Sequence, residues 1–250
     1  LAGAFNAVLD RVDAALEQQH RFTADASHEL RTPVAIIRSE AEVALDAAWR
    51  TPEEYRDALG VIRDGSEQLS RIVNDMFLLA RSDAGQAAIG RAPIYLDELA
   101  TDVVRSMSAL AAARGIRLAL NALDEVAYLG DEALLKRVLV NLLDNAIKHA
   151  PSGSVVTVAL HTRSDGHALS VTDAGAGVPT AARALVFNRF FRADEARSRH
   201  DGGRGTGAGL GLSIAREIAE LHGGRLWLHE PAAGTTTFEL VLPLNPDLLR

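Results

Sequence analysis

The chain has 250 residues, 48% of them hydrophobic, so it is long enough for two domains and can bury a sizeable core. Its net charge of −7 argues against a broad nucleic-acid-binding surface, and we expect no nucleic acid among its partners. Without cysteine it can form neither disulfides nor thiolate metal sites. No stretch approaches the roughly 18 continuous apolar residues of a membrane span. Because the chain opens at Leu1 with neither an initiator Met nor a signal peptide, we expect a fragment of a longer protein.

Residues 1–83 are predicted to be almost entirely helical. Apolar residues recur in steps of four and three, as in a coiled-coil seam, and Trp49–Pro52 interrupts the pattern. Thr51 is the predicted N-cap of the second helix, with Glu54 completing a capping box. One seam of that helix holds Tyr55, Leu59, Ile62, Ser66, Leu69, Val73, Met76 and Ala80. The broad apolar stripes predict an all-α helical hairpin that dimerises as a homodimeric four-helix bundle.

A small, Gly-containing stretch ending in Pro, residues 84–93, indicates a linker, which we place at 85–93. Helices and strands alternate beyond it. The predicted helices are 96–113, 131–150 and 210–221, and the predicted strands are 116–121, 126–129, 155–162, 169–172, 225–230 and 236–242. Paired strands with segregated helices predict an α+β sandwich, so the chain as a whole is a multi-domain protein.

The segment Ser27–Pro33 holds a histidine beside a helix-distorting proline. At 100° per residue, His28 lies about 160° from the Leu30 seam and should face solvent, with Thr32 one turn further on the same face. Pro33 lacks an N–H, so the carbonyl of Glu29 loses its helical partner and the helix should bend there. A neutral imidazole next to a carboxylate suits a nucleophile, although a lone surface histidine usually has no such role.

Polar residues also share one face of the helix predicted over 131–150. Asn141, Asn145 and Lys148 lie within about 60° of one another. Two carboxamides and an ammonium can serve Mg²⁺ and phosphates, and a merely solvated helix face is the alternative interpretation.

Two glycine-containing motifs follow. Asp173, Gly175 and Gly177 stand at the end of a predicted strand, where the carboxylate can accept from an exocyclic amine such as that of adenine. Turns often show the same pattern. The Gly-rich run 202–212 leads into a helix, and backbone N–H groups at a helix N-terminus bind anions. This run is neither a Walker A loop nor a Rossmann turn.

Taken in order, over nearly all 250 residues, these segments resemble the cytoplasmic part of a bacterial two-component sensor histidine kinase. The matching segments are Ser27–Pro33 (H box), Asn141–His149 (N box), Asp173–Gly177 (G1 box), Phe187–Arg192 (F box), Gly207–Leu212 (G2 box) and Gly234–Phe238 (last glycine box). The resemblance implies the end of a HAMP or signalling helix at 1–22 and a dimerisation and phosphotransfer domain at 23–84. A catalytic ATP-binding domain of the Bergerat type is implied at 94–250.

The resemblance also implies residue roles. His28 is the phospho-acceptor, Glu29 orients or deprotonates it, and Thr32 serves in dephosphorylating a partner regulator. ATP and Mg²⁺ are the implied cofactors, with Asn145 and Asn141 on the metal side and residues 194–208 as a lid. The implied cofactor-binding residues are Asn141, Asn145, Lys148, Asp173, Gly175, Gly177, Arg192, Gly207, Gly209, Leu210, Gly211, Leu212 and Thr236.

The implied partners are a second copy of the chain and the receiver domain of a response regulator. An upstream sensor would anchor the full-length protein, with this part on the cytoplasmic side of the bacterial inner membrane. Gyrase-like ATPases of the same fold carry Glu where Asn141 stands, and without that base attack by water should be slow. An ATP-binding scaffold and a phosphatase-dominant dimer stay open as alternatives. The remaining histidines lack ligand spacing and are expected at the surface or in the lid: His20, His161, His167, His200, His222 and His229.

Overall fold

The computed structural model describes residues 2–46, 51–87, 89–122, 125–191, 209–229 and 234–244. Before Thr23, side chains are described only at Asn6 and Glu17. The chain divides into two compact units, Leu1–Ala80 and Arg81–Arg250, and each is described by itself. Within the described ranges, no helix has both the length and the apolar character that crossing a membrane requires.

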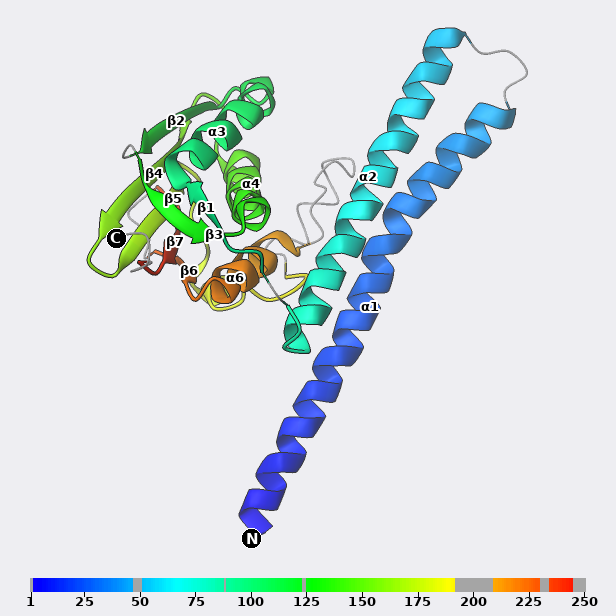
Figure 1. Ribbon diagram of the computed structural model, residues 1–250. Helices are drawn as coiled ribbons and strands as arrows, with labels where there is room; N and C mark the ends of the chain where they lie inside the picture. Colours follow the sequence, from blue (N-terminus) through cyan, green and yellow to red (C-terminus); the bar gives the residue numbers. More distant parts are fainter. Residues whose placement is uncertain are drawn as a thin grey trace. The chain divides into compact units, whose positions relative to one another are not determined.

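The first unit is a helical hairpin of α1 (Ala2–Asp46) and α2 (Pro52–Asp83), whose last turn belongs to the second unit (Figure 1). The predicted capping box is confirmed, because the Thr51 N–H donates to Glu54 Oε2 at 2.8 Å and the Glu54 N–H donates to Thr51 Oγ1 at 3.3 Å. Helix α1 continues through Pro33 without a break. The bend expected at that proline stays a prediction.

The buried residues of α2 form a narrow row, seven positions apart: Ala58, Gly65, Ile72 and Leu79. A Cβ built on Gly65 would lie 2.8 Å from Cγ1 of Ile37, so glycine allows the close approach at this point. None of the eight predicted seam residues belongs to this row, and Leu59 is 64% exposed. The apolar stripe of α2 is therefore broader than one partner helix covers, as the sequence predicts.

The second unit contains two sheets and three long helices. Its elements are β1 (Ala92–Tyr95), α3 (Leu96–Ala113), β2 (Arg117–Ala122), β3 (Ala127–Gly130), α4 (Glu132–His149), β4 (Val155–Arg163), β5 (Gly166–Asp173), α5 (Thr180–Arg183), α6 (Gly211–Leu221), β6 (Arg225–Leu228) and β7 (Thr236–Leu242). The main sheet has the order β2-β4-β5-β7-β6, with β2 and β4 parallel and the other neighbours antiparallel. Strands β1 and β3 form a separate antiparallel pair.

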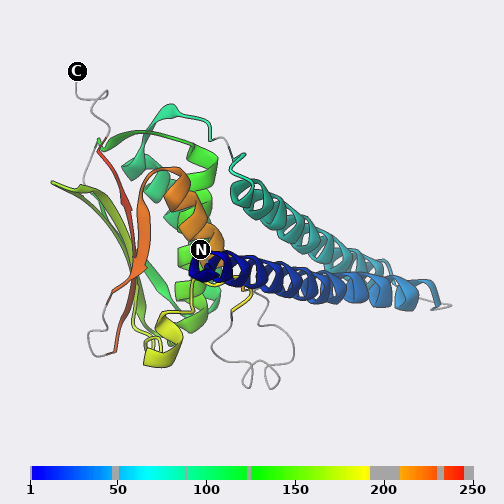
Figure 2. The same cartoon turned by 90° about the horizontal axis from the view of Figure 1, so that it is seen from below.

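Helices α3, α4 and α6 cover one face of the main sheet (Figures 1 and 2), which confirms the predicted α+β sandwich. Alternate strand residues such as Val158 and Leu240 are fully buried beneath these helices, as are Leu139 and Leu142 of α4. Each such side chain contributes about 1.5–3 kcal/mol through burial. Because α4 is anchored by its apolar face, its polar face is held in a fixed direction.

Candidate functional site

The histidine of the first unit is positioned by helix geometry. His28 and Thr32 are both exposed on α1, one turn apart, as the sequence predicts, whereas Glu29 is half-buried. The Thr32 hydroxyl lies 3.5 Å from the His28 carbonyl oxygen, at the outer limit of a hydrogen bond. The buried ring of Pro33 follows directly. This surface presents an accessible imidazole and a hydroxyl on one face.

In the second unit, α4 presents the predicted polar face. Asn141, Asn145 and Lys148 are half-buried, and Lys148 forms an ion pair with Asp144. The amide of Asn141 donates to the carbonyl oxygen of Gly211 at 3.1 Å, which ties the middle of α4 to the first turn of α6. Within the described residues, nothing hydrogen bonds to the carboxamide of Asn145. This face therefore retains a free carboxamide and a cation.

A buried carboxylate ends β5. Asp173 is 2% exposed and accepts a hydrogen bond from the Gly175 N–H at 2.7 Å. Burial raises the pKa of Asp173, and the Gly175 hydrogen bond, His149 and the Thr236 hydroxyl oppose that rise in decreasing order. A Cβ on Gly175 would lie 2.5 Å from Asp173 Oδ1 and 3.1 Å from the His149 carbonyl oxygen. Glycine is therefore required for this carboxylate to lie against the end of α4.

The start of α6 is a helix N-terminus without a side-chain cap. Leu210 is its N-cap and supplies no side-chain hydrogen bond, so a bound anion could satisfy the first backbone N–H groups of the helix. Gly209 has φ +65°, and its carbonyl oxygen accepts from the Phe190 N–H at 3.0 Å. Phe190 has φ +61°. This hydrogen bond joins one residue on each side of the interval from 192 to 208.

The structure brings the predicted motifs together around α4. Asn141 contacts the α6 start, while the His149 end of the same helix adjoins Asp173 and Gly175, and Thr236 of β7 contacts Asp173. Gly177 lies on the same loop with φ +79°. Arg192, Gly207 and the predicted lid 194–208 lie outside the described residues. A buried acceptor, amide donors and a cation in one place can bind a nucleotide.

The expectation of a surface position is wrong for His222. Its ring is 3% exposed, its Nδ1 lies 2.8 Å from the Ile218 carbonyl oxygen, and its Nε2 accepts from the Asp131 N–H at 3.1 Å. Burial lowers its pKa, and it also lowers the pKa of the half-buried His167. His222 fastens the end of α6 to the start of α4. No local spacing signals this role, because Asp131 is 91 residues away.

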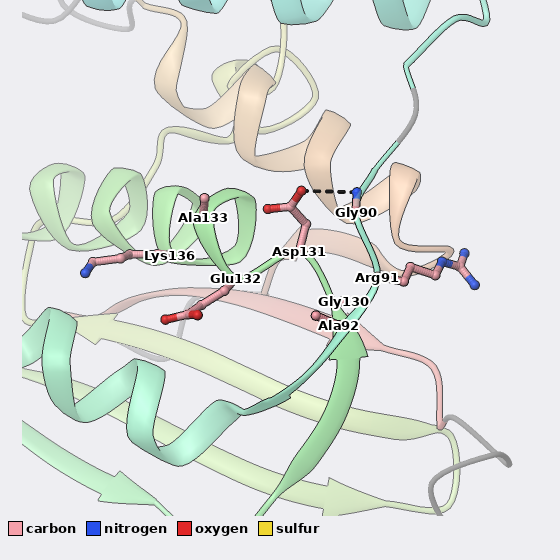
Figure 3. Close-up of a pocket in the computed structure, with 8 residues that line it drawn as sticks. All are labelled: Gly90, Arg91, Ala92, Gly130, Asp131, Glu132, Ala133 and Lys136. Carbon is pink, nitrogen blue, oxygen red and sulfur yellow. Dashed lines mark hydrogen bonds between the residues drawn. The ribbon is translucent and has the colours of Figure 1, made fainter.

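An open pocket of about 600 Å³ lies at the start of α4, at the opposite end of that helix from His149 (Figure 3). Its lining includes Arg91 and Lys136 as well as Asp131 and Glu132, so cations and carboxylates balance. The Gly90 N–H donates to Asp131 Oδ2 at 3.2 Å, which fixes the segment entering β1. Since a balanced lining gives no preference for polyphosphate, the group of residues around Asp173 is the stronger candidate for a nucleotide site.

Comparison with family models identifies two domains. Residues 18–85 match the His Kinase A (phospho-acceptor) domain. Residues 130–246 match the histidine kinase-, DNA gyrase B- and HSP90-like ATPase. Among curated proteins, the sensor protein IrlS of Burkholderia pseudomallei is 37% identical over 242 residues, which are 97% of this chain and 51% of that protein. The signal transduction histidine-protein kinase/phosphatase MprB of Mycobacterium leprae is 36% identical over 257 residues, 98% of this chain and 47% of that protein. The chain thus spans about half the length of these relatives.

Solved structures agree. The mycobacterial sensor histidine kinase MprB is 32% identical, with a TM-score of 0.52 over 61% of this chain and 97% of that one. Full-length ShkA in complex with AMPPNP is 28% identical, with a TM-score of 0.62 over 88% of this chain and 46% of that one. ThkA in complex with the response regulator protein TrrA shares the fold, at 21% identity and a TM-score of 0.66 over 94% of this chain and 64% of that one. With a phospho-acceptor domain followed by an ATPase domain, the chain belongs to the family of two-component sensor histidine kinases.

Proposed function

We propose that the second unit binds ATP with Mg²⁺ and that its γ-phosphoryl group is transferred to His28. The phosphoryl group then passes to an aspartate of a response regulator receiver domain. The observation that carries this proposal is the pairing of an exposed imidazole with an ATPase-like site that has a carboxamide, Asn141, in place of an acid.

Nucleotide binding is supported by three groups of the second unit. The Asp173 carboxylate is aimed by Gly175 and Thr236, and it would accept the hydrogen bond of the adenine amine. The backbone N–H groups at the start of α6, which lack a side-chain cap, would hold phosphate oxygens. Lys148 would release its ion pair with Asp144 and contact a phosphate of the nucleotide instead. The relative ShkA, solved with AMPPNP, is consistent with such a site.

Mg²⁺ would neutralise charge between the phosphate oxygens when bound. Among the described residues, no group of three or more His, Asp or Glu side chains could hold a metal ion. Mg²⁺ takes few protein ligands and completes its shell with phosphate oxygens and water. Asn145, whose carboxamide oxygen is uncommitted in the described structure, would be the main ligand, with Asn141 beside it.

In the transfer step, one neutral ring nitrogen of His28 would attack the γ-phosphorus. A nitrogen–phosphorus bond forms, the bond from phosphorus to the β,γ-bridging oxygen breaks, and ADP leaves. The proton on the other ring nitrogen would pass to Glu29 or to water. In the second transfer, a proton would return to the same ring nitrogen from Glu29 or water. The receiver carboxylate would attack the phosphorus, the nitrogen–phosphorus bond would break, and neutral His28 would leave.

Position 141 separates this proposal from an ATPase function. The amide of Asn141 donates to the Gly211 carbonyl, and a carboxamide cannot take a proton from water. Hydrolysis of ATP would therefore be slow, and the γ-phosphoryl group would stay on ATP until a nucleophile of the first unit attacks it.

Two copies of the chain would pack through the exposed apolar stripe of α2, which includes Leu59, Val73 and Phe77. The exposed hydroxyl of Thr32, one turn from His28, would assist removal of phosphate from the regulator. MprB is named a kinase/phosphatase, and ThkA was solved with a response regulator protein; both are consistent with these roles.

We also propose that the protein to which this chain belongs carries a sensor region anchored in the bacterial inner membrane, with the chain on the cytoplasmic side. The support is that IrlS is named a sensor protein and is about twice as long. Replacing that region with a soluble dimeric helix in the natural protein tests the idea, which predicts loss of membrane association with retention of kinase activity.

Incubation with γ-labelled ATP and Mg²⁺ tests the central proposal. Wild-type protein should acquire a label that is stable to base and labile to acid, and His28→Ala should acquire none. His161→Ala, at an exposed histidine of the second unit, should label like the wild type. Equal label on His28→Ala would move the acceptor elsewhere. Bound ATP without label on either protein would favour a scaffold or a phosphatase-dominant dimer.

A further inference from the structure

The last turn of α2, which belongs to the second unit, is held by a compact ionic cluster. Arg189 donates from both terminal nitrogens to the carboxylate of Asp83, at 2.7 Å each. The hydroxyl of Ser82 donates to Glu217 of α6, and Arg189 lies 4.0 Å from that carboxylate. All four residues belong to the second unit, which begins at Arg81. They form what we call the α2 clamp.

The clamp differs from the ordinary ion pairs of this chain. The Arg189 side chain is only 19% exposed and binds Asp83 in a fork, the geometry in which a surface pair holds its partner best. Asp83 also raises the pKa of Arg189, chiefly through this hydrogen bond. By contrast, the Arg216–Glu220 pair of α6 joins two half-exposed side chains one turn apart. The geometry therefore favours a more persistent contact in the clamp than in the Arg216–Glu220 pair.

Its location joins α2 to the nucleotide site. Arg189 precedes Phe190, whose N–H donates to the Gly209 carbonyl, and Glu217 lies on the helix that begins at Gly211. The clamp thus lies next to the proposed phosphate-binding turn without including any of its residues.

The clamp also closes the linker on itself. Beyond Asp83, the chain returns to the second unit at Gly90, which bonds to Asp131, and then at β1, which pairs with β3. The six residues 84–89 between these points could extend to roughly 20 Å as a tether. While Asp83 stays on Arg189, both ends of that tether are fixed to one unit, and it cannot act as a hinge.

We propose that Arg189 and Glu217 form a docking site for Ser82 and Asp83 of the same chain, and that this clamp restrains autophosphorylation until it opens. The restraint rests on the proposed function, because His28 and the nucleotide lie in different units and must approach each other. Docking itself does not depend on that function.

Two variants open the clamp, Asp83→Asn and Glu217→Gln, and neither residue contacts the proposed nucleotide site. Their matched controls are Asp64→Asn on α2 and Glu220→Gln on α6, each of which removes an exposed pair. Asp83→Glu keeps the carboxylate and should behave like the wild type. At saturating ATP and Mg²⁺, the opened variants should autophosphorylate about two- to fivefold faster, the range expected for loss of one such pair. Their affinity for AMPPNP should match that of the controls.

Hydrogen exchange of the nucleotide-free protein provides a readout that needs no activity. Peptides covering 84–89 should exchange faster in Asp83→Asn than in Asp64→Asn. Unchanged exchange would overturn the docking. Faster exchange with an unchanged or lower phosphorylation rate would overturn the restraint. If the wild type forms no phosphohistidine, the proposed function fails and the exchange alone decides whether the clamp exists.

Discussion

Gly209 immediately precedes Leu210, the N-cap of α6, where we propose that phosphate binds. Alanine at position 209 should reduce both the stability of the second unit and its nucleotide binding. Its φ of +65° is in the left-handed region, which costs an alanine about 1–2 kcal/mol. A Cβ would also lie 2.7 Å from the Phe190 carbonyl carbon and 2.8 Å from its Cα. Since backbone atoms cannot rotate away as a side chain can, the hydrogen bond from Phe190 to Gly209 should break, at about 0.5–1.5 kcal/mol.

Gly153 offers the matched control. It has φ +83° in the same unit, but a Cβ there meets nothing within 4 Å. Gly153→Ala therefore carries only the left-handed strain, about 1–2 kcal/mol, whereas Gly209→Ala should lose about 1.5–3.5 kcal/mol. The difference between the two variants isolates the collision with Phe190.

Urea unfolding of the second unit, followed by Trp227 fluorescence in a Trp49→Phe background, measures these losses. Titration with AMPPNP and Mg²⁺ should show about tenfold weaker binding for Gly209→Ala, because the N–H groups of the following turn shift away from the phosphates. Gly153→Ala should bind like the parent. Equal unfolding free energies for the two variants would refute the reasoning.

Three further changes have defined outcomes. Burial lowers the pKa of His222 below its ordinary 6.5, so the unfolded chain takes up the proton first, and the free energy of unfolding should fall as the pH drops below 6.5. In urea titrations at several pH values, the free energy of unfolding should depend less steeply on pH in His222→Gln than in the wild type. The control variant His161→Gln should behave like the wild type. Asp173→Asn should weaken ATP binding about ten- to hundredfold by calorimetry, because a charged acceptor is lost, while Asp165→Asn in the exposed β4–β5 turn should not. Thr51→Ala should destabilise the first unit by about 1 kcal/mol in thermal melts followed by circular dichroism, since the N-cap is lost; no loss would contradict the capping box.

Features encoded by neighbouring residues were predictable from the sequence. The capping box of Thr51 and Glu54 needs only a spacing of three, and the polar face of α4 needs only helical periodicity. The motif order also placed Asp173 at the end of a strand. In each case the signal and the contact lie within a few turns of chain.

Features that depend on distant partners were not predictable. Strand β5 begins at Gly166, three residues before the predicted start, because His167 pairs with Leu242 of β7. A Cβ on Gly166 would lie 2.2 Å from the Leu242 carbonyl oxygen, so this glycine permits the pairing that its own type gives no reason to expect. The burial of His222 and the partnership of Arg189 with Asp83, 106 residues apart, follow the same logic. These contacts are determined by tertiary packing, because many other residues of the chain have the same local sequence preferences.

Asn141 shows how one residue type serves geometry and chemistry together. Its N–H₂ group donates to the Gly211 carbonyl and thereby fixes the first turn of α6 against α4. A glutamate in its place has no proton to donate at neutral pH, so it could not make this bond, but it could activate water. A carboxamide at this position therefore holds the proposed phosphate-binding turn in place and leaves the site without the base that hydrolysis requires. On this argument the ATP-binding unit is built to keep its nucleotide intact, which is useful only if a nucleophile arrives from elsewhere, and the exposed imidazole of His28 is suited to be that nucleophile.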